Sequence, residues 1–205
     1  MRKEHGLLHA VVGCLLLAVA PSQAQTGKPS AAAGGPLTSS KNQVAGISER
    51  VVDNLYRYTD KYFHDGDYNR IVSLCRIIVE ADPSFTEAYE NAAYLLWSQG
   101  DSAAADRFLE MGLKRSKNQL SLLYEFGSHL MRTKRHEAAL PYLQKAVKLP
   151  KAGPLVYVEL AHCYEKNNNL KQSVATWQEV VRKFPNFPSG PPNLARTKRQ
   201  LASGG

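Results

Sequence analysis

Cysteine is scarce in this sequence, which has three cysteines, three methionines and two tryptophans in 205 residues. Cys14 lies in an apolar run near the start, so that Cys75 and Cys163 remain beyond it. An even pair permits a disulfide in an oxidising compartment, but each of these two residues lies within a helical pattern among apolar neighbours. We therefore expect Cys75 and Cys163 to be buried free thiols.

Motifs that carry chemistry are also absent. The sequence contains no HExxH, P-loop, GxSxG, CxxC or CxxCH pattern, which argues against zinc protease, P-loop nucleotide, hydrolase, thiol-redox and haem sites. The histidines beyond the first apolar run are His64, His129, His136 and His162, and His129, His162 and Cys163 are too few for a metal site. No carboxylate pair is marked out as acid and base. We expect no enzymatic activity, no cofactor and no metal.

Charge of one sign is not concentrated anywhere in the chain. Lys and Arg number 26 against 18 Asp and Glu, for a net charge of +8, but the basic residues are spread along the sequence. This distribution is weak evidence for nucleic acid, and we expect no nucleic-acid partner. The 43% of apolar residues suffices for one ordinary core.

The first 24 residues resemble a secretory signal peptide. A basic start, "MRKEH", precedes the apolar run "GLLHAVVGCLLLAVA", which is too short to span a bilayer comfortably, and Ser22 and Ala24 are the small residues that a signal peptidase requires. We predict cleavage after Ala24. An alternative is that "VVGC" is a lipobox and that Cys14 is acylated, although "LLLAVA" continues the run beyond it. An uncleaved anchor is a further alternative.

Residues 25–44 predict a flexible leader. The segment reads "QTGKPSAAAGGPLTSSKNQV", which is rich in Gly, Ser, Ala and Pro and has no apolar periodicity.

Beyond the leader, a pattern repeats every 34 residues, in units that begin at Val52, Thr86, Leu120 and Pro154. Apolar or small residues recur at the fourth, eighth, eleventh, twentieth and twenty-fourth positions. The fourth position holds Leu55, Tyr89, Leu123 and Tyr157; the eighth holds Thr59, Ala93, Gly127 and Ala161; the twenty-fourth holds Cys75, Leu109, Leu143 and Trp177. Four consecutive matches at one period indicate a repeat architecture.

Each unit has two apolar stripes at helical spacing, which predicts a helical hairpin. The turns are predicted at Gly66-Asp67, Gly100-Asp101, Lys134-Arg135 and Asn168-Asn169. Pro83, Pro150 and Pro185 are placed to end second helices of these hairpins.

The 34-residue period, the small residues at the eighth and twentieth positions, the aromatic or Leu at the eleventh and the closing prolines resemble the tetratricopeptide repeat family. The resemblance covers residues 52–185 and implies an all-α, right-handed solenoid of four hairpins, which we assign to residues 45–187. Thr59, Ile71 and Ile78 are bulkier than the family's residues at those places. The first hairpin is therefore expected to be looser or atypical, as terminal repeats vary.

The resemblance also implies a concave groove lined by the first helix of each hairpin. In that helix, positions two, five, nine and twelve share a face that differs from the core stripe. The predicted partner-binding residues there are Asp53, Tyr56, Asp60, Phe63, Glu87, Glu90, Tyr94, Trp97, Tyr124, Met131 and His162, accompanied by Ser121, Ser128, Leu155, Val158 and Glu165.

Aromatic rings with scattered carboxylates suit an extended or helical peptide that carries apolar side chains and some positive charge. The alternative role for these aromatics is packing within the superhelix or beneath the leader. Chaperone-binding members of the family use Lys and Asn in the groove, whereas this chain has acids and a tyrosine in those slots, so that mode is not expected.

Residues 188–205 are predicted to form a loop and a basic helix from about residue 193 to residue 201. The simplest role of this helix is to cap the last hairpin, with Leu194 and Ala195 at the seventh and eighth positions of a partial fifth unit. The alternative is contact with an anionic partner through Arg196, Lys198 and Arg199.

Together these features predict an exported bacterial scaffold or adaptor of the cell envelope that binds a protein or peptide without chemistry of its own. One alternative is a membrane-tethered lipoprotein of an envelope assembly, which requires lipidation of Cys14. Another is a cell-wall or carbohydrate-acting enzyme that uses Glu87 or Glu90 and stacks sugars on the aromatics. The sequence predicts no oligomeric state.

Overall fold

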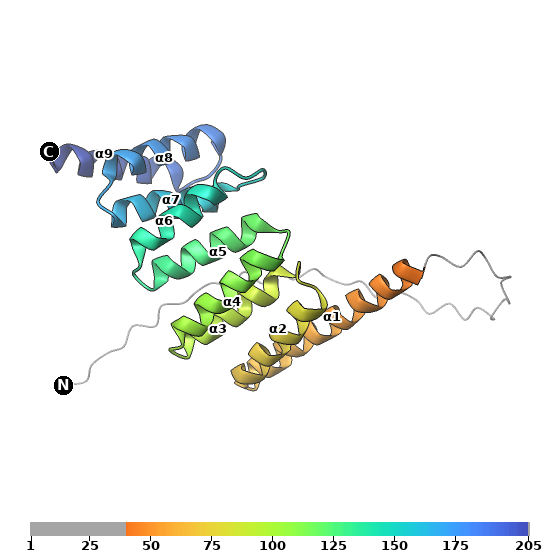
Figure 1. Cartoon of the computed structure of the whole chain (residues 1–205). Helices are drawn as coiled ribbons and strands as arrows, with labels where there is room; N and C mark the ends of the chain where they lie inside the picture. Colours follow the sequence, from red (N-terminus) through yellow and green to blue (C-terminus); the bar gives the residue numbers. More distant parts are fainter. Residues whose placement is uncertain (1–39, 205) are drawn as a thin grey trace, which may run out of the picture. The chain divides into compact units, whose positions relative to one another are not determined.

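The computed structural model describes residues 40–204, which form nine α-helices and no strand (Figure 1). The helices are α1 (Ser40–His64), α2 (Tyr68–Ala81), α3 (Thr86–Ser98), α4 (Ser102–Arg115), α5 (Gln119–Arg132), α6 (His136–Ala146), α7 (Pro154–Lys166), α8 (Leu170–Lys183) and α9 (Gly190–Ser203). All nine helices lie in one compact unit of the chain. The predicted signal peptide and residues 25–39 of the predicted leader lie outside the described residues.

Consecutive helices pack as four hairpins, α1–α2, α3–α4, α5–α6 and α7–α8. Each second helix also contacts the first helix of the next hairpin, and α9 contacts α8. The hairpins therefore stack in chain order, as Figure 1 shows from the orange α1 to the blue α9. This arrangement confirms the predicted all-α helical repeat solenoid.

The hairpin turns repeat with the same 34-residue period as the core. Gly66, Gly100, Lys134 and Asn168 all have φ between 57° and 91°, the left-handed conformation that ends a helix. In the first turn, the N–H of Asp67 donates to the carbonyl of Tyr62, and the N–H of Gly66 donates to that of Phe63. The other three turns have the same pair of bonds. Gly66, Gly100 and Asn168 tolerate this conformation well, whereas Lys134 adopts it without that advantage.

The second helices begin at side chains that cap them. The carboxylates of Asp67 and Asp101 accept a hydrogen bond from the backbone N–H three residues further on, and the side-chain oxygen of Asn169 does the same. Such caps satisfy one of the backbone donors that a helix leaves open at its start. Arg135, at the same repeat position, makes no side-chain cap.

The predicted core positions are buried, except that Leu55, Tyr62 and Tyr164 are half-buried. Every residue at the twenty-fourth position has no exposed surface, including the large side chains of Trp177, Leu109 and Leu143. In the third hairpin the small residue at the eighth position, Gly127, lies so close to Leu143 that an added Cβ would be 2.5 Å from its Cδ2. The close contact between α5 and α6 therefore depends on a glycine packing against a large side chain.

The first hairpin differs from the others at its start. Helix α1 begins at Ser40, so residues 40–44 of the predicted leader are helical. Nothing in "SKNQV" prevents a helix from extending past the hairpin, since the segment lacks Pro and Gly. Thr59, Ile71 and Ile78 are buried despite their size. What makes this hairpin atypical is the exposed outer side of α1, where Ile47, Val51 and Tyr58 are about half exposed.

Helix α9 covers the last hairpin, as the capping prediction requires. It runs from Gly190 to Ser203, with proline in its first turn, where the missing N–H has no cost. Leu194 packs against the cluster of Tyr157, Ala161 and Trp177. Ala195 is exposed, and Thr197 is the fully buried residue instead.

Cys75 and Cys163 are free and fully buried, which confirms the prediction of buried thiols. Burial raises the pKa of the Cys75 thiol to about 12 and that of Cys163 to about 11, so neither is a reactive thiolate at neutral pH.

Among residues 40–204, no helix combines the length and apolar character needed to cross a membrane.

Candidate partner-binding face

The first helices of successive hairpins lie side by side, because α3 contacts α5 and α5 contacts α7. Their side chains at positions two, five, nine and twelve, together with Arg132, Glu125 and Glu159, form what we call the first-helix face. The predicted binding residues of α3, α5 and α7 lie on this surface.

The centre of the first-helix face is an aromatic pair with a cation above it. The rings of Tyr94 and Trp97, on α3, lie with their centroids 5.6 Å apart. The guanidinium carbon of Arg132, on α5, is 5.9 Å from the Tyr94 centroid and 5.3 Å from that of Trp97. A nitrogen of Arg132 is 2.7 Å from a carboxylate oxygen of Glu125. These contacts hold the rings in place while Tyr94 remains 47% exposed.

A row of carboxylates runs beside the aromatic pair, with Glu90 on α3, Glu125 on α5 and Glu159 on α7. Burial raises the pKa of Glu90, and the neighbouring charges of Glu125 and Glu87 add to this, against a hydrogen bond from Ser121. Burial also raises the pKa of Glu159, with Glu125 adding to it against His162 and Arg132. A cation from outside would therefore stabilise the charged forms of Glu90 and Glu159.

The predicted residues of the first hairpin divide into packed and exposed ones. Tyr56 packs edge-on against Phe85, with centroids 4.9 Å apart, and its hydroxyl accepts a hydrogen bond of 2.8 Å from Asn91. Phe63 is 54% exposed, and Asp53 and Asp60 are exposed. Tyr56 is therefore partly a packing residue, which is the alternative role that the sequence left open.

The other predicted residues differ in exposure. Glu87 is exposed, whereas Tyr124 and Met131 are half-buried, and burial raises the pKa of Tyr124. Ser128 is buried. His162 is half-buried and packs edge-on against Trp177, with ring centroids 5.2 Å apart. The accessible part of the predicted set is thus concentrated on α1 and α3.

Glu165 was grouped with the face but is a structural residue. Its Oε1 accepts hydrogen bonds from Ser173 (3.1 Å), Trp177 Nε1 (3.0 Å), Arg196 (2.9 Å) and Thr197 (3.0 Å). Although burial favours the neutral acid, the bonds from Trp177, Arg196 and Thr197 lower the pKa of Glu165. The position-twelve rule fails here because α9 covers this end of α7.

Arg196 of α9 belongs to the same network. It forms an ion pair with Glu165 within the protein, whereas Lys198 and Arg199 are exposed.

The sequence prediction missed Arg132, Glu125 and Glu159. Glu125 and Glu159 occupy the sixth position of their units and Arg132 the thirteenth. These positions follow directly after the predicted fifth and twelfth ones, and Arg132 lies four residues beyond Ser128 on the same side of the helix. Widening the predicted face by one residue would have found all three.

His129 is a buried residue that pairs with a carboxylate of its own chain. It is fully buried, and its Nε2 is 2.8 Å from a carboxylate oxygen of Asp106, which also pairs with Arg135. Burial lowers the pKa of His129 despite the nearby carboxylate, so the ring is neutral at pH 7. In the part of the chain that the structure describes, no group of three or more His, Cys, Asp or Glu could hold a metal.

Residues 120–152, which cover nearly all of the third hairpin, match the tetratricopeptide repeat family model. No curated protein sequence matches the chain. Several solved structures share its fold at low sequence identity. MamA from Desulfovibrio magneticus RS-1 has a TM-score of 0.59 at 19% identity, over 74% of this chain and 85% of that one.

Two further structures are similar. PilF from Pseudomonas aeruginosa has a TM-score of 0.62 at 19% identity, over 76% of this chain and 71% of its own. YrrB, described as a TPR protein with an unusual peptide-binding site, has a TM-score of 0.56 at 18% identity, over 76% of this chain and 84% of its own.

The stacked hairpins and the covered last repeat define a helical-repeat solenoid, a class of protein that offers surfaces for protein binding. The matched repeat and the shared fold identify it more closely. Residues 120–152 match the tetratricopeptide repeat model, and the described helices have the fold of solved tetratricopeptide repeat proteins.

Proposed function

We propose that the protein is a non-catalytic adaptor of the cell envelope whose first-helix face binds a peptide segment of a partner protein. The segment carries apolar side chains and at least one Lys or Arg. The observation that carries the proposal is the aromatic pair of Tyr94 and Trp97, held by Arg132 and flanked by the carboxylate row.

The physical argument combines two features of this face. Tyr and Trp offer large, rigid contact area and are enriched among the residues that dominate binding energy. The half-buried Glu90 and Glu159 resist ionisation, and a cation placed beside them would stabilise their charged forms. A peptide with an apolar side chain next to a basic one satisfies both. YrrB, which shares the fold, is itself described as having a peptide-binding site.

The proposal is tested by crosslinking in cells that make the protein, with recovery of its partners for the wild type and the double variant Tyr94→Ala, Trp97→Ala. We expect the variant to lose the partner, with affinity for the recovered partner reduced by about 30-fold or more, as for aromatic residues that dominate an interface. Tyr58→Ala, which removes an exposed aromatic of α1 outside this face, serves as the control. Recovery of the same proteins by a folded double variant contradicts the proposal.

Placement in the envelope rests on the predicted signal peptide and is tested separately. Mass spectrometry of the exported protein should find an N-terminus at Gln25. Incorporation of labelled palmitate that is lost in Cys14→Ser would instead favour the membrane-tethered lipoprotein.

A further inference from the structure

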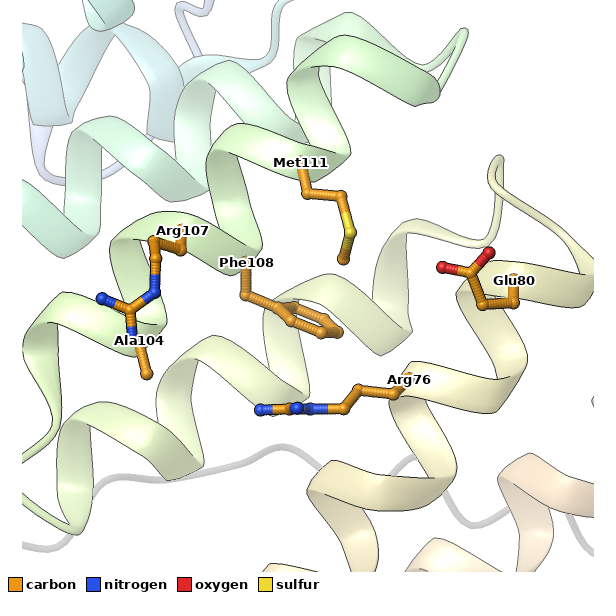
Figure 2. A pocket seen from close by; sticks show the side chains of 6 residues that line it. All are labelled: Arg76, Glu80, Ala104, Arg107, Phe108 and Met111. Atoms are coloured by element: carbon orange, nitrogen blue, oxygen red, sulfur yellow. The ribbon is translucent and has the colours of Figure 1, made fainter.

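A hollow separate from the first-helix face lies between the second helices of the first two hairpins. A hollow of about 350 Å³ opens between α2 and α4 and is lined by Arg76, Glu80, Ala104, Arg107, Phe108 and Met111. Figure 2 shows Arg76 and Glu80 extending from α2 toward α4, and Phe108 and Met111 extending from α4 toward α2. None of these residues belongs to the first-helix face.

The floor of the hollow is apolar and firmly packed. Phe108 is only 6% exposed, and its ring packs against the buried Tyr89, with centroids 5.5 Å apart. Met111 is half-buried beside it. A thioether and an aromatic ring at the base of a hollow of this size suit one or two bulky apolar side chains.

The rim of the hollow carries an excess of positive charge. Its one carboxylate, Glu80, is already paired with both terminal nitrogens of Arg115, at 2.6 and 3.0 Å. The bond to Arg115 lowers the pKa of Glu80, so this carboxylate is ionised and neutralised at pH 7. Arg76 and Arg107 have no ion-pair partner within residues 40–204. Two guanidinium groups therefore remain available to a ligand.

This pair of arginines is a feature of one interface, not of the repeat. Arg76 is at the twenty-fifth position of the first unit and Arg107 at the twenty-second of the second. The next two interfaces have Glu110 with Pro141 and Gln144 with Ala175 at these positions. The helix packing that the repeats share does not require the positive charge.

We propose that the hollow between α2 and α4 is a second protein-binding site, which takes a partner segment carrying an acidic side chain next to a bulky apolar one. The carboxylate pairs with Arg76 and Arg107, and the apolar side chain packs on Phe108 and Met111. The protein's own leader does not fit this chemistry, because residues 25–44 contain two lysines and no Asp or Glu. A scaffold with two such sites of opposite charge preference can hold two different partners at once.

The test uses the full chain and three short fluorescent peptides, measured by anisotropy. One peptide alternates Asp with Leu, a second replaces Asp by Asn, and a third replaces Leu by Ser. We expect the Asp–Leu peptide to bind, each of the others to bind at least about tenfold more weakly, and added salt to weaken binding.

Variants of the protein locate the site. Arg76→Glu, Arg107→Glu should weaken binding of the Asp–Leu peptide by at least about tenfold, and Arg76→Gln, Arg107→Gln by less. Lys145→Glu, Lys148→Glu, which makes the same charge change at exposed residues of the third hairpin, should have little effect. Tyr94→Ala should also have no effect, which separates this site from the first-helix face.

Three outcomes would overturn the proposal: equal binding of the Asn–Leu peptide, unchanged binding by the folded Arg76→Glu, Arg107→Glu variant, or no saturable binding.

Discussion

Gly127 lies where α5 meets α6, and no side chain fits there. A Cβ added to it would lie 2.5 Å from Leu143 Cδ2 and 2.6 Å from its Cγ, in the fully buried contact between the two helices. We predict that Gly127→Ala lowers the free energy of unfolding by about 1–3 kcal/mol, the usual cost of overpacking a core, measured by urea denaturation.

Gly46 is the matched control at the same scale. It lies within α1, and nothing is found within 4 Å of an added Cβ. Gly46→Ala should be neutral or stabilise the protein by up to about 1 kcal/mol through helix propensity. Similar effects of the two substitutions would mean that the α5–α6 contact is not tight.

At the scale of the element, the carboxylate of Glu165 links α9 to the last hairpin by hydrogen bonds. The side chains of Arg196 and Thr197 on α9 both donate to Glu165 on α7. We predict that Glu165→Gln lowers the free energy of unfolding by about 1–3 kcal/mol at pH 7 and speeds hydrogen exchange in α9.

The pH dependence of this effect has a definite sign. Because the pKa of Glu165 is lowered on folding, its contribution is full above the ordinary glutamate pKa and is lost as the pH falls through the folded value. The difference in stability between wild type and Glu165→Gln should therefore shrink when urea denaturation is repeated in acid. Glu179→Gln, which alters an exposed pair with Arg182 on α8, should change stability by less than about 1 kcal/mol. A pH-independent difference would show that the network does not act through the carboxylate charge.

At the scale of the whole molecule, the two ends of the stack are unlike. The last hairpin is covered by α9, whereas Ile47, Val51 and Tyr58 on the outer side of α1 are about half exposed. The seventh position of each unit reports this difference. The residues at this position in the last three units, Ala92, Phe126 and Leu160, are buried. The residue of the first unit, Tyr58, is 54% exposed.

We predict opposite outcomes for two aromatic truncations at this one repeat position. Phe126→Ala should cost about 3–5 kcal/mol, because the ring is 3% exposed and packs against Tyr142. Tyr58→Ala should change the free energy of unfolding by less than about 0.5 kcal/mol, because Tyr58 is already 54% exposed. Thermal and urea denaturation of the two variants measures the contrast. A large loss in Tyr58→Ala would indicate that another part of the chain or a second copy covers α1.

Much of the fold could be predicted because its signals are local. The turn residues Gly66, Gly100 and Asn168 tolerate the left-handed conformation by their own chemistry. The start of α1 was placed five residues late, because "SKNQV" is compatible with helix but has no apolar periodicity to reveal it.

The candidate site was predicted less completely, because exposure depends on neighbours. Tyr94 and Trp97 were placed on the first-helix face from their spacing alone. Arg132, which lies above both rings from the next hairpin, was missed, since the contact between α3 and α5 joins residues 35 positions or more apart.

The sequence by itself determined the period, the helical hairpins, their turns and the residues of each core stripe, because periodicity and backbone preference act over a few residues. Only the tertiary structure decided which of the remaining side chains meet solvent. It placed Glu165 beneath α9, Arg132 over the aromatic pair, and Arg76 and Arg107 around one hollow. These outcomes depend on helices from different hairpins coming together, and the spacing within a single helix does not contain that information.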